Sequence, residues 1–215
     1  MIAGTERSPR KPKGRGAERR EEILDAAQRL FTERGVMAVT TREIAAAVGI
    51  SQPALYAHFH SRDEILVDLC ERSFRALAER MAALPLGVRD RAGFLEMCRV
   101  YIDFGLEQPD AYRVAFMLEA KASEAAQLEA RILAAGLDTF EDFRARLAQL
   151  VDAGMTRSGD ARLLAQSLWS GLHGLVSLLL ARREFPWVDI ETLVARHLEL
   201  LADGILATDP VTPRR

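Results

Sequence analysis

Closely spaced signals for starting and ending helices in residues 35–66, GVMAVTTREIAAAVGISQPALYAHFHSRDEIL, constrain the fold of this chain more than any other feature. Thr40 is followed by Glu43 at the spacing of a reciprocal capping box, in which each side chain accepts a backbone N–H of the other residue. Val39 and Ile44 flank this box at the positions of a hydrophobic staple. A helix should therefore begin directly after Thr40.

A second helix should follow after a very short turn. The first is expected to end near Val48, where Gly49 supplies the left-handed residue that closes it. Ser51 can cap the next helix, and Pro53 is tolerated in its first turn. Helices joined by so short a turn cross at a steep angle, so the pattern predicts a helix-turn-helix.

The two helices should have distinct faces. The inward set is apolar and should pack against a third helix: Ile44, Ala45, Val48, Leu55 and Phe59. The outward set is polar or aromatic and contains no acid: Gln52, Pro53, Tyr56 and His58. Such a face can contact base edges in a major groove without repelling phosphate. Ser61 and Glu64 repeat the capping-box spacing and put Arg62 in a first helical turn, where phosphates are attracted.

Three segments, FTERG, TTREIAAAVGISQPALYAHF and SRDEIL, resemble the TetR family of bacterial transcriptional repressors. The resemblance implies an all-α fold, with an N-terminal three-helix bundle containing the helix-turn-helix and a larger helical domain that binds a small molecule and forms a homodimer. It also implies DNA contacts from Thr40, Thr41, Arg42, Ser51, Gln52, Pro53, Tyr56, His58 and Arg62. Many relatives carry a lysine where this chain has Arg62, and a lysine or arginine where it has Gln52, so the base preference at Gln52 is open.

The chain divides into four segments by composition and helical periodicity. We expect a basic disordered arm over 1–16, the DNA-binding domain over 17–62, the ligand-binding and dimerisation domain over 63–206 and a flexible tail over 207–215. Helices are expected over 17–34, 41–48, a short segment after Ser51, 61–83, 91–108, 110–118, 123–153, 160–183 and 189–206. The helix from Ser61 is long enough to link the two domains.

The arm concentrates positive charge in a chain whose formal net charge is −2. Its basic residues continue into the first helix: Arg7, Arg10, Lys11, Lys13, Arg15, Arg19 and Arg20. Only Glu6 and Glu18 oppose them. Such an arm can lie along phosphates or in a minor groove, and it can equally be a solvated tail.

Composition argues against several other classes of protein. The sequence contains no run of 18 apolar residues, so no membrane span is predicted. The basic N-terminus lacks the apolar stretch of a signal peptide, so a cytoplasmic location is expected. Cys70 and Cys98 lack metal-ligand spacing and should be buried thiols, so neither a metal nor a cofactor is expected. The four histidines belong to no catalytic motif, so we expect no enzyme.

Aromatic and methionine side chains are concentrated in the C-terminal domain. The candidate ligand-binding residues are Phe94, Met97, Tyr101, Phe104, Tyr112, Phe116, Phe140, Phe143, Trp169 and His173. An interior of this kind can line an apolar pocket, and it can also be ordinary core.

The segment WSGLHG, residues 169–174, places two glycines inside an otherwise favourable helix. Each glycine costs about 1 kcal/mol relative to alanine, so close approach of another helix or of a ligand should compensate. The Trp-x-Gly-x-His-Gly pattern is similar to the C-terminal domain of one TetR subgroup. His173 can hydrogen-bond a ligand, or it can be a core histidine with a neighbouring partner.

The last two helices carry long apolar faces that should partly close the core and partly form the dimer interface. Their members are Leu163, Leu164, Leu168, Leu172, Val176, Leu179 and Leu180, then Ile190, Leu193, Val194, Leu198, Leu201 and Ile205. Two such helices from each subunit would make an isologous four-helix bundle, as the family implies. The dimer would hold two recognition helices about 34–36 Å apart, or a multiple of one DNA turn, and so read a palindrome.

Together with these patterns, the resemblance to the TetR family implies a ligand-responsive regulator, a repressor whose operator affinity changes when a small molecule enters the C-terminal domain. Its expected partners are a double-stranded DNA operator, a small-molecule effector and a second copy of the chain, with no membrane. Arg42 and Gln52 are candidates for base contacts, and Thr40 and Arg62 for phosphate contacts. The alternative is an architectural or effector-independent DNA-binding protein, which the same DNA-binding domain permits.

Overall fold

The computed structural model describes residues 15–84, 88–117 and 126–207, and every named element within them is a helix. Residues 1–14 of the expected arm, residues 208–215 of the expected tail and the start of the helix expected over 123–153 lie outside the described residues. The chain forms two compact units, which meet in sequence between Leu66 and Val67.

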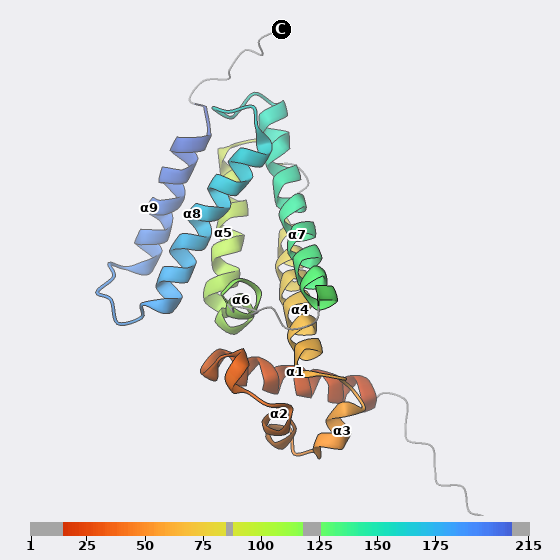
Figure 1. The fold of residues 1–215 in the computed structure, drawn as a ribbon. Coiled ribbons are helices and arrows are strands. Elements are labelled where there is room, and N and C mark those ends of the chain that lie inside the picture. Colours follow the sequence, from red (N-terminus) through yellow and green to blue (C-terminus); the bar gives the residue numbers. More distant parts are fainter. Residues whose placement is uncertain (1–14, 85–87, 118–125, 208–215) are drawn as a thin grey trace, which may run out of the picture. The chain divides into compact units, whose positions relative to one another are not determined.

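Over its described residues, 15–66, the first unit contains three α-helices, one 3₁₀ turn and the start of a fourth helix (Figure 1). The elements are α1 (Arg15–Arg34), η1 (Val36–Ala38), α2 (Thr41–Ala47), α3 (Gln52–Tyr56) and the beginning of α4 (Arg62–Ala82). Fully buried side chains form its core: Ile23, Phe31, Ile44, Leu55, Phe59 and Ile65. Gly35 ends α1 at φ +80°, a conformation that glycine adopts without steric cost.

The local signals of the helix-turn-helix are confirmed. Thr40 Oγ1 accepts the Glu43 N–H at 3.3 Å, and Glu43 Oε2 accepts the Thr40 N–H at 2.8 Å, which completes the reciprocal capping box. Gly49 has φ +70°, as a left-handed helix stop requires. Ser51 Oγ accepts the Ala54 N–H at 3.3 Å and caps α3.

The second expected capping box, at the start of α4, is only half formed. Ser61 Oγ accepts the Glu64 N–H at 3.0 Å, as expected. Glu64 Oε2, however, accepts the N–H of His60 at 2.6 Å and not that of Ser61. The carboxylate thereby satisfies the backbone one residue earlier and still fixes the entry of the chain into α4.

The second unit is built around α8. Its elements are the remainder of α4, α5 (Arg91–Glu107), α6 (Pro109–Phe116), α7 (Ala126–Asp152), α8 (Ala161–Ala181) and α9 (Ile190–Ile205). α8 contacts α5, α7 and α9, and α5 also contacts α6 and α9. In Figure 1, α8 crosses in front of α5 with α9 on one side and α7 on the other.

Among the described residues, α8 alone has the length and apolar content that would suffice to cross a membrane. Its apolar residues have another explanation, because most of them face the core of the second unit. The buried ones are Leu164, Ala165, Leu168, Leu172, Leu175, Val176, Leu179 and Leu180. Much of the apolar face predicted for α8 therefore closes the core and is not available to a partner.

Two glycines allow close contacts around α8. A Cβ on Gly105 of α5 would lie 2.4 Å from Val176 Cγ1, so α5 and α8 can approach this closely only at a glycine. A Cβ on Gly171 would lie 2.9 Å from Leu201 of α9, and His197 Nε2 lies 3.1 Å from the Gly171 carbonyl oxygen. The compensation expected for Gly171 is thus supplied by α9.

The end of α9 is fastened to the segment that follows α7. Thr156 and Leu206 form an isolated antiparallel bridge. The Ala207 N–H donates to the Met155 carbonyl oxygen at 2.9 Å. Residue 207, which the sequence placed in a flexible tail, is therefore anchored.

Candidate nucleic-acid interface and cavity

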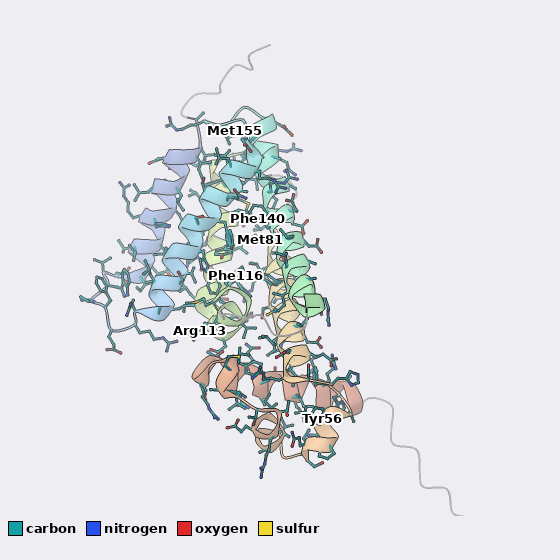
Figure 2. All side chains as sticks on the ribbon, in the orientation of Figure 1. Tyr56, Met81, Arg113, Phe116, Phe140 and Met155 are labelled. Carbon is teal, nitrogen blue, oxygen red and sulfur yellow. The ribbon has the colours of Figure 1, made fainter. Side chains whose placement is uncertain are left out.

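The short helix α3 separates a buried face from an exposed one. Leu55 is fully buried, as the apolar pattern predicts. Pro53 is exposed, Tyr56 is 43% exposed and Gln52 is half-buried. Figure 2 labels Tyr56 in α3. The outward face thus presents an aromatic ring and an amide, both of which suit contact with base edges.

Thr41, a candidate DNA contact, is buried and supports that face from below. It is 9% exposed, and its hydroxyl accepts the Gln52 Nε2–H at 3.1 Å and lies 3.3 Å from the Tyr56 hydroxyl. Thr41 therefore orients two outward residues across the turn. In the free protein it exposes little surface for a direct DNA contact, so the direct contact expected from the sequence stays a prediction.

We predict that Thr41→Val lowers operator affinity about 3- to 10-fold, the loss expected when roughly one hydrogen bond no longer orients Gln52 and Tyr56. Valine keeps the shape and removes the hydroxyl. Fluorescence anisotropy with a labelled operator measures the effect, and Thr41→Ser, which keeps the hydroxyl, is the matched control. An unchanged operator affinity in the valine variant would show that the Thr41 hydroxyl does not contribute to operator binding.

Arg42 is the cation that α2 leaves available. It is exposed and makes no hydrogen bond or ion pair with another residue in the described ranges. The neighbouring acid, Glu43, is neutralised by Arg34 at 2.6 Å. The Thr40 backbone N–H, followed by the Arg34 side chain, lowers the pKa of Glu43 to about 2. Glu43 therefore stays ionised and paired, and it adds little repulsion against phosphate.

The expected phosphate anchors are already engaged within the first unit. The Thr40 hydroxyl and N–H both donate to Glu43 Oε2 at 2.8 Å, so neither donor is available. Arg62 donates to the Val36 carbonyl oxygen at 3.3 Å and pairs with Asp63 at 3.3 Å. Phosphate contact from Thr40 requires an exchange of partners, and each guanidinium nitrogen of Arg62 also already makes a hydrogen bond.

Arg20 of α1 holds the end of the recognition helix, a role that sequence reasoning missed. It donates to the carbonyl oxygen of His58 at 2.5 Å, and its guanidinium lies 4.0 Å from the centre of the Phe59 ring. His58 itself is half-buried, and Ser51 is exposed. Sequence alone offered only the charge of Arg20, because its partners lie 38 residues further along the chain.

The second unit contains a largely apolar cavity of about 490 Å³. Six of the candidate ligand residues line it: Tyr101, Phe116, Phe140, Phe143, Trp169 and His173. Figure 2 shows Met81, Phe116 and Phe140 in the interior of this unit. A volume of this size suits a small organic molecule.

The other four candidates do not line this cavity. Phe94, Met97, Phe104 and Tyr112 are fully buried core residues. Sequence reasoning missed the residues contributed by α4, Ala115 of α6, the lining residues of α7 other than Phe140 and Phe143, and Arg162 and Gln166 of α8. The additional lining residues are Phe74, Leu77, Met81, Ala115, Ile132, Leu133, Gly136, Leu137, Thr139, Arg162 and Gln166. Phe74, Leu77 and Met81 follow helical spacing on α4, which was the available signal.

A chain of hydrogen bonds borders the cavity. Trp169 Nε1–H donates to Tyr101 Oη at 3.1 Å, Tyr101 Oη lies 3.0 Å from Tyr112 Oη, and Tyr112 Oη lies 2.7 Å from His173 Nδ1. Burial raises the pKa of Tyr101 to about 12 and also raises that of Tyr112. Burial lowers the pKa of His173 below its usual range. Both phenols therefore keep their protons, and the imidazole is neutral at and above neutral pH.

Two family models match the chain. Residues 23–69 match the N-terminal model described as bacterial regulatory proteins of the tetR family, and residues 94–201 match the model described as a tetracyclin repressor-like C-terminal domain. A curated relative, the nucleoid occlusion factor SlmA of Cronobacter sakazakii, is 32% identical over 194 residues, which cover 84% of this chain and 95% of the relative.

Solved structures share the fold. PfmR, a TetR family transcriptional regulator from Thermus thermophilus, superposes with a TM-score of 0.69 at 22% identity, covering 85% of this chain and 97% of that one. The fatty acid degradation regulator FadR from Bacillus halodurans superposes with a TM-score of 0.72 at 18% identity, covering 89% and 97%.

Proposed function

The chain belongs to the TetR family of bacterial regulatory proteins, and on that premise we propose that it is a ligand-responsive repressor that binds a palindromic operator as a homodimer. Membership implies DNA binding and dimer formation. The observation that supports the ligand response is the cavity of about 490 Å³, lined by the Trp169 and His173 side chains of the WSGLHG segment.

Two residues are our candidates for base readout. Arg42 is exposed, so its guanidinium can donate two hydrogen bonds to one guanine. The Gln52 amide already donates one N–H to Thr41, which holds it in one orientation and leaves its oxygen and second N–H for an adenine. The remaining candidates, Ser51, Pro53, Tyr56, His58 and Arg62, would position the helix on the sugar–phosphate backbone or contact base methyl groups.

We predict that Arg42→Ala and Gln52→Ala each relax base preference at one position of each half-site, reducing discrimination there by about 1–3 kcal/mol. Binding to operators substituted at every position measures this. If both variants weaken binding to all sequences equally, they contact phosphates and not base edges.

Dimerisation through α8 and α9 is supported by exposed leucines and by glycines without close neighbours on these helices. Leu163 and Leu178 of α8 and Leu200 of α9 are each more than half exposed. A Cβ on Gly174 or on Gly204 would meet no atom within 4 Å in the described chain, so nothing in the subunit accounts for either glycine. A partner helix packed closely against them would do so.

The proposed coupling runs through α4. This helix begins at Arg62, beside the helix-turn-helix in sequence, and contributes Phe74, Leu77 and Met81 to the cavity. A ligand that prefers one position of α4 would change operator affinity by about 1–3 kcal/mol, or some 5- to 150-fold.

A thermal-shift screen of apolar small molecules, followed by operator titrations with each compound that binds, tests the proposed function. The proposal expects bound compounds to change the operator Kd within that range. Compounds that occupy the cavity and leave the operator Kd unchanged would contradict the ligand response.

A second candidate is effector-independent DNA binding, favoured by relatives named nucleoid occlusion factor that are 30–32% identical and matched over most of their length. Mapping of bound sites across a genome separates the two. A few promoter sites support the repressor, and many dispersed sites support the second candidate.

We assign the protein to the cytoplasm, where its DNA partner would lie, and give it no catalytic role. No group of three or more His, Cys, Asp or Glu side chains in the described ranges is arranged to hold a metal ion. The expected absence of metal and cofactor stays a prediction.

A further inference from the structure

The hydrogen-bond chain beside the cavity has a direction. Trp169 can only donate, so Tyr101 Oη accepts its N–H. If Tyr101 then donates to Tyr112, and Tyr112 to His173 Nδ1, every hydroxyl proton in the chain has an acceptor. In this arrangement His173 carries its proton on Nε2.

The opposite direction leaves a buried donor unpaired. If His173 Nδ1–H donated to Tyr112 and Tyr112 to Tyr101, the Tyr101 oxygen would accept two hydrogen bonds and its own proton would have no acceptor among the described residues. Tyr101 is 4% exposed, which leaves little surface through which water could accept that proton. An unsatisfied buried hydroxyl is costly, and the first direction is therefore favoured.

The Nε2 atom of His173 makes no hydrogen bond within the described residues, whereas Tyr112 occupies Nδ1. In the described ranges, Thr32 Oγ1 is the one side-chain N or O atom that is both fully buried and without a hydrogen-bond partner. Because His173 Nε2 also lacks a partner, it cannot be fully buried and is therefore accessible. Since His173 lines the cavity, its N–H is available to a molecule inside it.

We propose that the cavity binds an uncharged, largely apolar molecule whose one carbonyl oxygen accepts the Nε2–H of His173. This inference rests on the proposed function and specifies the class of effector. The hydrogen-bond chain fixes His173 as a donor, so the site selects an acceptor.

Charge in the lining argues against an anionic ligand. Among the lining residues that the structure describes, Arg162 is the one basic residue besides His173, and it pairs with Glu141 at 2.7 Å. Glu141 is also paired with Arg144 at 2.5 Å. A carboxylate in the cavity would have to displace Glu141 or remain unpaired among aromatic rings, whereas a carbonyl needs only one donor.

Matched ligands test the class directly. Two series share their rings and differ in the polar group: benzophenone, diphenylmethane and diphenylacetate, then benzylacetone, butylbenzene and phenylbutyrate. In calorimetric titrations at about pH 8, where the His173 imidazole is neutral, we expect each ketone to bind about 3- to 10-fold more tightly than its hydrocarbon, the gain from roughly one hydrogen bond. The carboxylate of each series should bind most weakly.

Two variants assign the preference to His173. In His173→Phe the ratio of ketone to hydrocarbon affinity should fall below about twofold. In Phe140→Leu, the matched control, both affinities should fall while the ratio stays, because only apolar lining changes. Equal binding of ketone and hydrocarbon by the unaltered protein, a ratio that survives His173→Phe, or tightest binding of a carboxylate would each overturn the inference.

The tautomer can be measured without any ligand. Long-range ¹H–¹⁵N spectra, assigned with His173→Phe, should show the proton of His173 on Nε2. Tyr112→Phe, which lies outside the cavity lining, should give a mixture of tautomers and a smaller ketone preference. A proton on Nδ1 in the unaltered protein would overturn the inference.

Failure of this inference is distinguishable from failure of the proposed function. Compounds that bind without ketone preference and still shift the operator Kd leave the ligand-responsive repressor standing. A clear ketone preference with no effect on the operator Kd supports the inference and contradicts the ligand-responsive repressor. If none of the six compounds binds at millimolar concentration, the inference falls, while the thermal-shift screen and the operator titrations still decide the ligand response.

Discussion

Gly174→Leu is expected to convert the dimer into monomers and to lower operator affinity by about 10²- to 10⁴-fold, the advantage that linking two binding modules provides. Gly174 lies four residues before the exposed Leu178 and so on the same face of α8. A Cβ there meets nothing within 4 Å in the part of the subunit that the structure describes, so the larger side chain should be harmless to the fold and obstruct only a close partner.

Sedimentation velocity at micromolar concentration and operator titration measure the two effects together. Gly159→Leu is the matched control, because a Cβ at Gly159 also meets nothing within 4 Å and the residue lies outside α8 and α9. Circular dichroism should show the same helix content in both variants. A Gly174→Leu protein that stays dimeric with normal operator affinity would remove this face of α8 from the interface.

Gly105→Ala is expected to lower the free energy of unfolding by about 1–3 kcal/mol, the usual cost of overpacking a tight core. In an open helix the same change would stabilise by about 1 kcal/mol. Here the new methyl group would lie 2.4 Å from Val176 Cγ1 and 3.0 Å from the Tyr112 ring, both in fully buried side chains. Either α5 and α8 move apart or Val176 leaves its rotamer.

A double-mutant cycle tests whether the steric clash is between the new methyl group at position 105 and Val176. Val176→Ala alone should destabilise by leaving a cavity, but in its background the cost of Gly105→Ala should shrink, because the methyl group in the way is gone. Urea unfolding at one fixed protein concentration measures all four proteins, since dimerisation makes apparent stability concentration-dependent. Additive effects would show that the close approach at Gly105 is not what limits packing.

The local structure of the first unit could be predicted from sequence because its signals act over three or four residues. The capping box at Thr40, the left-handed Gly49 and the Ser51 cap each depend on neighbours along the chain. The burial of Thr41 could not be predicted in this way. It depends on Gln52 and Tyr56 meeting the Thr41 hydroxyl across the turn.

The cavity shows the same limit on a larger scale. Helical spacing grouped Phe94, Met97, Tyr101 and Phe104 in α5, but it could not say which of them would border empty space. Tyr101 does so, while the other three are sealed in the core. The role of Gly105 was equally hidden, since it depends on a contact with Val176, 71 residues further along the chain.

Selection of bound duplexes from a random DNA library, with purified protein at about 150 mM salt, tests the central claim most directly, because non-specific phosphate attraction is partly screened there. The account predicts enrichment of a palindrome whose half-sites lie about one helical turn, or a multiple of it, apart. No enrichment, in a protein that still binds DNA at low salt, would contradict a sequence-specific dimeric regulator and favour effector-independent binding.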